Sequence, residues 1–275
     1  MSLVRLTEVL GGSGPRAVGA FNVIMIEHAE ALVAAAERAG QPVVLQISEN
    51  AVKYHGALEP IARATLAAGE AAAVPVVVHL DHATRTDLTE EAIALGFGSV
   101  MFDASKLGYD ENVAATAAVV AKAHAAGVDV EAELGEVGGK DGVHAPGART
   151  DPDEAAAFVE ATGVDALAVA VGSSHAMTER TASLDLELIT RLRDRLPVPL
   201  VLHGSSGVPD DELVRAVEAG MRKINIGTHL NVVFTRAVRE RLGADPDLVD
   251  PRKYLTPARE AVADEVTRLI TLLAR

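Results

Sequence analysis

Short apolar runs alternate with longer amphipathic stretches along most of the chain. The runs are rich in Val, Ile, Leu and Ala, and they have the length and polar or glycine boundaries of buried strands. We predict eight strands: Ala17–Val23, Pro42–Ser48, Pro75–Leu80, Ser99–Phe102, Asp129–Glu133, Ala166–Val171, Pro199–Leu202 and Lys223–Ile226. Continuously apolar strands of this kind are typical of a parallel sheet that is covered on both faces.

The stretches between these runs have helical periodicity. Among them are Glu27–Ala39, Leu58–Ala72, Glu111–Ala126, Asp153–Ala161, Leu186–Arg195 and Asp210–Ala219. The repeated alternation of strand and helix favours a (β/α)8 TIM barrel, an α/β fold, as one domain over residues 1–275, with an extra C-terminal helix from Pro251. The alternative is an open doubly wound sheet, which is disfavoured because no glycine-rich dinucleotide turn follows the first run.

Composition narrows the chemistry. Hydrophobic residues make up 49% of the 275 residues but aromatic residues only 3%, so the core must consist of small aliphatic side chains. The chain has no cysteine, which excludes disulfides and leaves His, Asp and Glu as the metal ligands. We expect a cytoplasmic protein without a membrane partner, because there is neither a signal-peptide pattern nor an apolar run of about 20 residues. The net charge of −14 argues against binding to nucleic acid.

Three histidines each follow the end of an apolar run: His82 after the third, His175 after the sixth and His203 after the seventh. In a barrel, the carboxyl ends of all strands lie on one face, which is where active sites are built. Imidazole is a common zinc ligand, and three protein ligands with one open position form a catalytic zinc site. The sequence therefore predicts a catalytic Zn²⁺ ion held by these three side chains.

Carboxylates stand at the same strand ends. Asp81 precedes the first of these histidines, where it could pass a proton to and from a metal-bound substrate. Asp103 ends the fourth run, and Glu131 and Glu133 lie two residues apart in the fifth, on the same side of that strand. Buried carboxylates are costly unless they are paired or near a cation. They are candidates for supporting the ligands or for holding a second divalent ion.

Small polar residues follow the last two runs and predict an anion site. They are Gly204, Ser205 and Ser206 after the seventh run, and Asn225, Ile226, Gly227 and Thr228 at the end of the eighth. Backbone amides and helix N-termini at such turns bind phosphate, and phosphate sites after barrel strands seven and eight recur. Asn22 and Ser48, at the ends of the first two runs, could bind substrate hydroxyls or simply cap the helices that follow.

A zinc ion beside an acid and a phosphate site suits an aldol reaction of a keto-phosphate, and the reverse is cleavage of a ketose bisphosphate. The proton would be removed by a base on the glycine-rich loop Gly135–Thr150, and Asp81 would protonate the new alkoxide. A lysine Schiff base is disfavoured: none of the six lysines ends a strand, and Lys223 begins the eighth run on the opposite face. A zinc-dependent hydrolase, or a non-catalytic binding protein with this fold, is the alternative.

Nine segments together resemble the class II, zinc-dependent fructose-bisphosphate and tagatose-bisphosphate aldolases. They are AFNV, PVVLQISENAVKYHG, VVVHLDHATRTD, GFGSVMFDASKLGYDENV, VEAELGEVGG, DALAVAVGSSH, PLVLHGSSGVPD, RKINIGTHLN and DPRKYLTPARE, which cover nearly the whole chain in order. The resemblance implies a (β/α)8 barrel, a phosphorylated sugar as substrate and a homodimer or homotetramer. It leaves open whether the ketose is fructose, tagatose or another phosphorylated ketose or sugar acid.

The resemblance also implies roles for particular residues. His82, His175 and His203 would bind the catalytic zinc, Asp81 would be the proton donor, and Asp103 and Glu133 match a second metal position. The expected contacts of dihydroxyacetone phosphate are Gly204, Ser205, Ser206, Asn225, Ile226, Gly227 and Thr228. A monovalent cation, Na⁺ or K⁺, is expected near the phosphate.

The chain departs from the family pattern at three places. Ala176 stands where the family has glycine, next to the expected phosphate. The tyrosine–lysine pair that usually follows is replaced by Thr178-Glu179, so Arg180 is the nearest cation. The glutamate base of the family's loop is also missing, and Asp141 is the candidate that replaces it. These departures concern how the donor phosphate is held and which group removes the proton.

Overall fold

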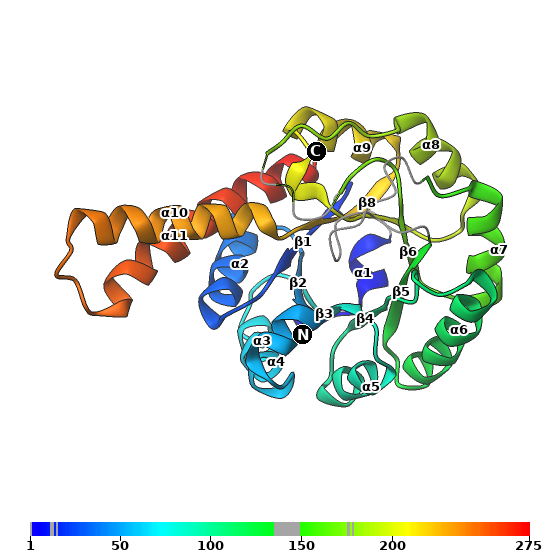
Figure 1. The fold of residues 1–275 in the computed structure, drawn as a ribbon, viewed down its shortest axis with the longest axis horizontal. Coiled ribbons are helices and arrows are strands. Elements are labelled where there is room, and N and C mark those ends of the chain that lie inside the picture. The colour runs from blue at the N-terminus through cyan, green and yellow to red at the C-terminus, as the bar shows by residue number, and fades with distance from the viewer. Residues whose placement is uncertain (1, 12–13, 15, 135–148, 175–176, 178) are drawn as a thin grey trace.

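Eight parallel strands close into a barrel in the computed structural model of the chain (Figure 1). The structure describes residues 2–11, 14, 16–134, 149–174, 177 and 179–275. Each strand pairs with its neighbours in sequence, and β1 pairs with β8 to complete the ring. The predicted (β/α)8 fold is confirmed, and the open doubly wound sheet is excluded.

The strands agree closely with the predicted runs. They are β1 Val18–Asn22, β2 Val43–Ser48, β3 Val76–Ala83, β4 Ser99–Phe102, β5 Asp129–Leu134, β6 Ala166–Val169, β7 Leu200–Leu202 and β8 Met221–Ile226. Two differences affect the site. Strand β3 continues past the predicted end at Leu80, and β8 starts before Lys223 rather than at it.

Helices surround the barrel as an outer layer (Figure 1). They are α2 Ile26–Ala39, α3 Glu49–His55, α4 Glu59–Glu70, α5 Thr86–Leu95, α6 Tyr109–Ala125, α7 Pro152–Thr162, α8 Leu186–Arg195 and α9 Asp210–Ala219. Their buried faces carry many alanines, which allows them to approach the strands closely, and this explains how a chain with so few aromatic residues forms a dense core.

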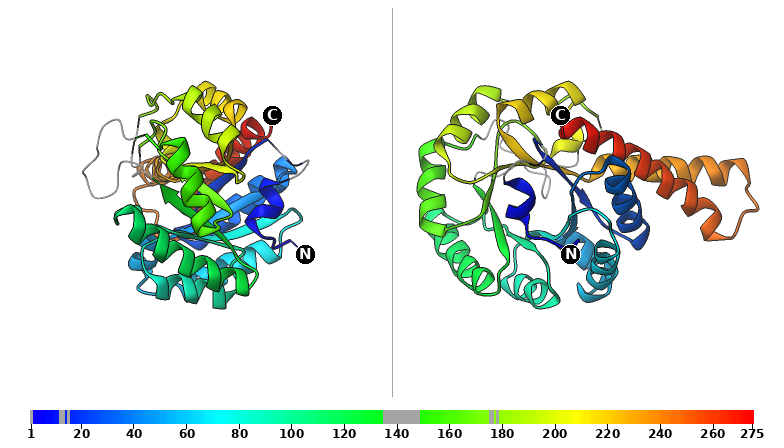
Figure 2. Two further views of the ribbon diagram at one scale, coloured as in Figure 1. Left: turned by 90° about the vertical axis from the view of Figure 1, so that its right-hand side faces the viewer. Right: turned by 180° about the vertical axis from the view of Figure 1, so that it is seen from behind.

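A separate apolar cluster fills the amino-terminal end of the barrel interior. The short helix α1, Leu6–Leu10, closes this end like a plug (Figure 2). Its buried side chains pack against inward-facing strand residues such as Val18, Val44 and Val201. Thr7 fastens the plug, because its backbone N–H and its hydroxyl both donate to Asp129 Oδ2 at 2.7 Å. The barrel interior at this end is therefore filled mainly by apolar side chains.

The last two helices, α10 Thr228–Ala244 and α11 Pro251–Leu273, form a hairpin that projects beyond the barrel (Figures 1 and 2). The predicted C-terminal helix is thus present. It is bound to α2 by ion pairs, with Arg38 2.8 Å from Glu260 and 2.9 Å from Asp264. Within the described part of the chain, no helix is both long and apolar enough to cross a membrane.

Shortening the plug should destabilise the whole fold. Leu6 is fully buried, so Leu6→Ala leaves a cavity, and we expect the free energy of unfolding to fall by about 2–5 kcal/mol. Val249→Ala is the control, because Val249 is 88% exposed and should change stability by less than about 0.5 kcal/mol. Urea unfolding followed by circular dichroism measures both, and equal midpoints for the two variants would contradict this role of α1.

Candidate active site

Asp81 and His82 are adjacent in sequence, yet both face the cavity at the carboxyl end of the barrel. In a regular strand, successive side chains point to opposite faces. Here the pairing of β3 with β4 shifts register between Leu80 and Ala83, as in a β-bulge, and His82 has a φ of 51°. It is the only non-glycine residue with a positive φ in the described part of the chain. The bulge therefore places a carboxylate and an imidazole side by side.

The imidazoles of His82 and His203 face one another across the barrel. Their rings meet edge to face at a centroid separation of 4.5 Å, and His82 Nε2 lies 2.8 Å from His203 Nδ1. His82 comes from the end of β3 and His203 follows β7 directly, so these two side chains, distant in sequence, meet as the sequence predicted.

The outer nitrogen of each ring contacts a carboxylate. His82 Nδ1 lies 3.0 Å from Asp103 Oδ2, and His203 Nε2 lies 2.8 Å from Glu131 Oε1. A carboxylate only accepts, so each outer nitrogen carries the proton and each inner nitrogen directs its lone pair at the other ring. Two nitrogens on a tetrahedral zinc ion are about 3.3 Å apart, close to the observed spacing. The donor set therefore fits a divalent cation.

Two overlapping groups of side chains could each hold a metal ion. One group is Asp81, His82 and His203, and the other is His82, Asp103 and Glu133, with ligand atoms within 4.8 Å of one another. The prediction that both glutamates of β5 face the same side is confirmed, because both are fully buried beside the His203 ring.

The third predicted zinc ligand, His175, lies outside the described residues, as do Ala176 and the candidate base Asp141. Ser174, the last described residue before them, is held close to the site. A Cβ added to Gly204 would lie 2.6 Å from the backbone carbon of Ser174, so glycine is required there, and Gly204 also has a φ of 67°. The segment that leads into residue 175 thus packs directly against the turn after His203.

Beneath the imidazoles, the barrel interior contains a buried polar layer. Lys223 Nζ donates to Glu131 Oε2 at 2.7 Å and lies 3.4 Å from His79 Nε2, while His79 Nδ1 is 2.9 Å from Ser99 Oγ. Burial, reinforced by the Lys223 charge, holds the pKa of His79 well below its usual range. The expectation that Lys223 sits at the opposite face of the barrel is wrong. Its side chain points into the barrel and reaches the carboxylate that supports His203.

The two turns predicted to bind phosphate are linked to each other. Ser206 Oγ accepts hydrogen bonds from the backbone N–H groups of Gly227 at 3.3 Å and His229 at 3.2 Å. A Cβ on Gly227 would approach Asn22 Oδ1 to 2.5 Å, so a larger residue there would displace the Asn22 side chain at the end of β1. The turn 204–207 and the N-terminus of α10 therefore lie together as one small cradle, in which the N–H groups of Gly227 and His229 are already bound to Ser206 Oγ.

Not every residue predicted to bind phosphate directs its side chain into the cavity. Ser205 is buried and donates to the carbonyl oxygen of Leu202, and Ile226 is buried in the core between strands and helices. Asn225 and Thr228 do line the cavity. Ser48 lines it too, and its hydroxyl also accepts from Ala51 N–H, which makes it the N-cap of α3.

The cavity has a volume of about 610 Å³ and holds most of the predicted site residues. It is lined in addition by residues that the sequence analysis did not single out: Gln46, Glu49, Asn50, Lys53, Tyr54, Lys106 and Asn231. Lys53 pairs with Glu49 at 3.0 Å, and Glu49 accepts from the backbone and hydroxyl of Thr84 in the turn after β3. For most of these residues the available signal was their position after β2 and β4, since loops after barrel strands face this end; Gln46 lies within β2 and Asn231 in α10.

Arg180, the nearest cation to the expected phosphate in sequence, is occupied elsewhere. Its Nε and Nη2 donate to the carbonyl oxygen of Val208 at 2.8 and 2.6 Å, and its Nη1 lies 2.6 Å from Asp210 Oδ1. The guanidinium therefore binds the start of α9. It does not line the cavity in this structure.

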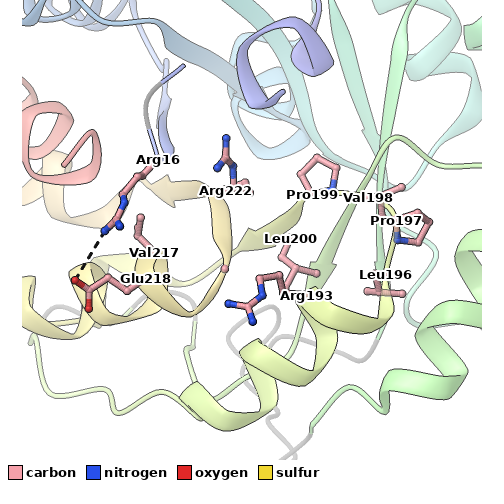
Figure 3. A pocket seen from close by; sticks show the side chains of 11 residues that line it. Arg16, Arg193, Leu196, Pro197, Val198, Pro199, Leu200, Val217, Glu218 and Arg222 are labelled. Atoms are coloured by element: carbon pink, nitrogen blue, oxygen red, sulfur yellow. Dashed lines mark ion pairs between the residues drawn. The ribbon is translucent and has the colours of Figure 1, made fainter. Parts of the chain in front are cut away.

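A second hollow of about 370 Å³ lies beside α8 and α9, near the amino-terminal ends of β7 and β8 (Figure 3). Its arginines have structural partners: Arg193 donates to the carbonyl oxygen of Ala219 at the end of α9, and Arg222 donates to that of Leu10 at the end of α1. Arg16 lies 3.9 Å from Glu218. These contacts give each of the three arginines a partner within the protein.

Comparisons with known proteins agree with the geometry. A family model described as "Fructose-bisphosphate aldolase class-II" matches residues 12–275. The chain is 42% identical over 268 residues to the fructose-bisphosphate aldolase of Geobacillus stearothermophilus, covering 95% of this chain and 93% of that protein. It is 41% identical over 276 residues to that of Thermus caldophilus, with 90% of each covered. Among solved structures, the YdjI aldolase from Escherichia coli K12 superposes with a TM-score of 0.82 at 34% identity, covering 94% and 91% of the two chains.

Glu265 of α11 should make a pH-dependent contribution to stability. Its Oε1 lies 2.7 Å from Nε2 of His229, a residue in the first turn of α10 beside the cradle. Burial alone would raise the pKa of Glu265, but hydrogen bonds from Arg268 and His229 outweigh it and lower the pKa from 4.5 to about 2. Because the folded-state pKa is depressed, the stabilisation is complete above pH 4.5 and is lost as the pH falls toward 2.

We therefore expect Glu265→Gln to lower the urea midpoint at pH 7, and the difference from the parent protein to shrink as the pH falls from about 4.5 toward 2. The matched control is Glu187→Gln, an exposed acid in the first turn of α8. A difference between Glu265→Gln and its parent that stays constant over this pH range would contradict the role of this carboxylate.

Proposed function

Because the chain belongs to the class II fructose-bisphosphate aldolase family, we propose that it reversibly cleaves a ketose 1,6-bisphosphate to dihydroxyacetone phosphate and glyceraldehyde 3-phosphate. Aldolases are lyases, and enzymes of this family are generally zinc-dependent. The observation that carries the proposal is the 2.8 Å approach of His82 Nε2 to His203 Nδ1, next to the Asp81 carboxylate. Asp81 and His82 both line the cavity.

The residues that would hold the catalytic zinc are His82, through Nε2, His203, through Nδ1, and His175. When bound, the ion supplies Lewis-acid polarisation of the carbonyl and the neighbouring hydroxyl oxygen of the substrate. Asp103 and Glu131 orient the two described rings and fix their tautomers. The grouping of His82 and Asp103 with Glu133 supports a second divalent position, and we place a monovalent cation, Na⁺ or K⁺, near the phosphate cradle.

Asp81 is proposed to move the proton at the hydroxyl of C4. Its side chain is buried, it lines the cavity, and its Oδ1 lies 3.9 Å from His82 Nε2, within reach of a substrate bound there. In cleavage, the carboxylate accepts the hydroxyl proton, the C3–C4 bond breaks and the aldehyde forms. The electron pair left on C3 then takes up a proton, for which Asp141 is our candidate. In synthesis both proton transfers run in reverse.

The donor phosphate is proposed to rest on backbone groups, assisted by the monovalent cation, rather than on the Arg180 side chain. Gly204, Ser206, Gly227 and Thr228 provide the cradle at the N-terminus of α10, where the helix dipole favours an anion. Arg180 is bound to Asp210 at the start of α9, which supports a phosphate site that does not use this arginine. Asn22, Ser48 and Asn225 are placed to bind substrate hydroxyls.

We further propose that residues 1–275 act as one barrel domain, that two or four copies assemble, and that the enzyme works in the cytoplasm. The hairpin of α10 and α11, which projects from the barrel, supports assembly because it exposes apolar residues such as Val232 and Leu242. A cytoplasmic site suits the substrate, since phosphorylated sugars are charged and are retained inside cells.

Chelation tests the metal requirement. Exhaustive dialysis against EDTA should abolish the release of glyceraldehyde 3-phosphate from fructose or tagatose 1,6-bisphosphate, and added Zn²⁺ should restore it. Borohydride with substrate should label no lysine: Lys223 is buried and engaged by Glu131, and Lys53 and Lys106, which line the cavity, have no role in the proposed reaction. Full activity after chelation would exclude the proposed chemistry, and release of inorganic phosphate without an aldehyde would favour a hydrolase.

A substitution tests the proton carrier. Asp81→Ala should keep zinc binding but reduce kcat by about 10²–10⁴-fold, the usual contribution of a positioned acid or base. Asp87→Ala, on the exposed first turn of α5, is the matched control and should leave turnover unchanged. Steady-state kinetics and metal analysis decide the matter; undiminished turnover in Asp81→Ala would refute the assignment.

A further inference from the structure

Three fully buried side chains form a line that ends at the proposed metal site. His203 Nε2 lies 2.8 Å from Glu131 Oε1, and Lys223 Nζ lies 2.7 Å from Glu131 Oε2, so the carboxylate is held at both oxygens. None of the three side chains is accessible to solvent. His79 Nε2, 3.4 Å from the ammonium, limits its movement from a second side. The line therefore has little freedom to rearrange.

An ammonium only donates, and this property determines how the line can be arranged. Lys223 must face an acceptor, so it keeps one oxygen of Glu131 and leaves the other for the ring of His203. That oxygen also only accepts, and at 2.8 Å it is the nearer partner of Nε2, which places the imidazole proton on Nε2 and the lone pair on Nδ1, toward His82. The side-chain amide of Asn225, whose Nδ2 lies 3.1 Å from the same Nε2, competes with Glu131 for this atom, so the tautomer depends on how firmly the carboxylate is held. The partner of His82 is held differently: Asp103 Oδ1 accepts from the hydroxyl of Ser105 at 2.7 Å, near the rim.

We propose that Lys223 is a positioning residue for the metal site: by holding Glu131 it fixes the tautomer of His203 that presents Nδ1 to the ion. The proposal rests on the function proposed above, because it assumes that His203 is a metal ligand. Lys223 acts only through the carboxylate, since it is fully buried and does not line the cavity.

Replacing the carboxylate by an amide distinguishes this role from simple charge pairing. In Glu131→Gln, Lys223 takes the amide oxygen, so the amide NH₂ turns toward His203. A donor at that place forces Nε2 to accept, and the proton moves to Nδ1, where it blocks the metal. In the double variant Lys223→Met/Glu131→Gln, no ammonium binds the amide oxygen. The amide oxygen can then accept the hydrogen bond from the His203 ring.

Zinc affinity of the metal-free protein, measured by competition with a chromophoric chelator, is the first readout. We expect Glu131→Gln to weaken zinc binding by on the order of 100-fold and the double variant to recover about tenfold of that loss. A double variant that binds zinc no better than Glu131→Gln would overturn the proposal. Leu6→Ala is the control for destabilisation alone, because it weakens the other end of the barrel and should leave zinc affinity unchanged.

The second readout is the tautomer of His203 in the zinc-free protein, determined from its imidazole ¹⁵N shifts. The parent and the double variant should carry the proton on Nε2, and Glu131→Gln should carry it on Nδ1. The same tautomer in all three would overturn the proposal. This readout needs neither bound metal nor turnover, so it decides the role of Lys223 even if the protein proves not to be an aldolase.

If Glu131→Gln does not fold, Lys223→Met in its zinc-free form carries the test. Its zinc affinity is not used, because it leaves an anionic carboxylate beside the ion that could itself become a ligand. Without the ammonium, Glu131 is released at one oxygen, so the Nε2 proton of His203 should exchange with water at least several-fold faster than in the parent protein. An unchanged exchange rate would overturn the proposal.

Discussion

The site depends on one constraint: charged groups inside the barrel must satisfy one another. Glu131 and Lys223 are both fully buried, and the desolvation of either alone would be prohibitive. Their 2.7 Å contact meets this need for one carboxylate oxygen, and the ring of His203 meets it for the other. The plug α1 contributes by filling the opposite end of the barrel with apolar side chains. The polar layer is therefore confined to the level just below the cavity.

The two imidazole arms reach the same place by different means. His203 follows β7, and the buried carboxylate of Glu131 orients its ring. His82 instead faces the cavity because of the bulge in β3 and its own left-handed backbone conformation. Such a conformation costs on the order of 1–3 kcal/mol and persists only where the surroundings enforce it. Here Asp103 holds its outer nitrogen at 3.0 Å. The strain is local and lies where two adjacent side chains both face the cavity.

Much of this could be predicted from the sequence, because strand ends, the period-two placement of Glu131 and Glu133 and the glycine turns are local patterns. The bulge was not predictable, since nothing in the amino-acid sequence around His82 indicates that β3 has one more residue than β4 at this point. The reach of Lys223 was missed for another reason: a lysine inside an apolar strand has meaning only once its partner, on a strand about ninety residues away, is known. The position of a residue along its strand could be predicted from the sequence, but its partner on another strand could not.

The departures near residue 178 illustrate how charge is distributed in this chain. With a net charge of −14, the protein repels an anion at long range, so the proposed phosphate binding must come from short-range groups. These can be backbone dipoles, bound cations or lysines of the cavity such as Lys53 and Lys106. Arg180 is not among them, because Val208 and Asp210 hold it on α9. Backbone amides at the N-terminus of α10 need no countercharge and cannot be lost by side-chain substitution. A cradle made from the backbone therefore tolerates changes in the loop after β6 that would disable a site relying on a lysine.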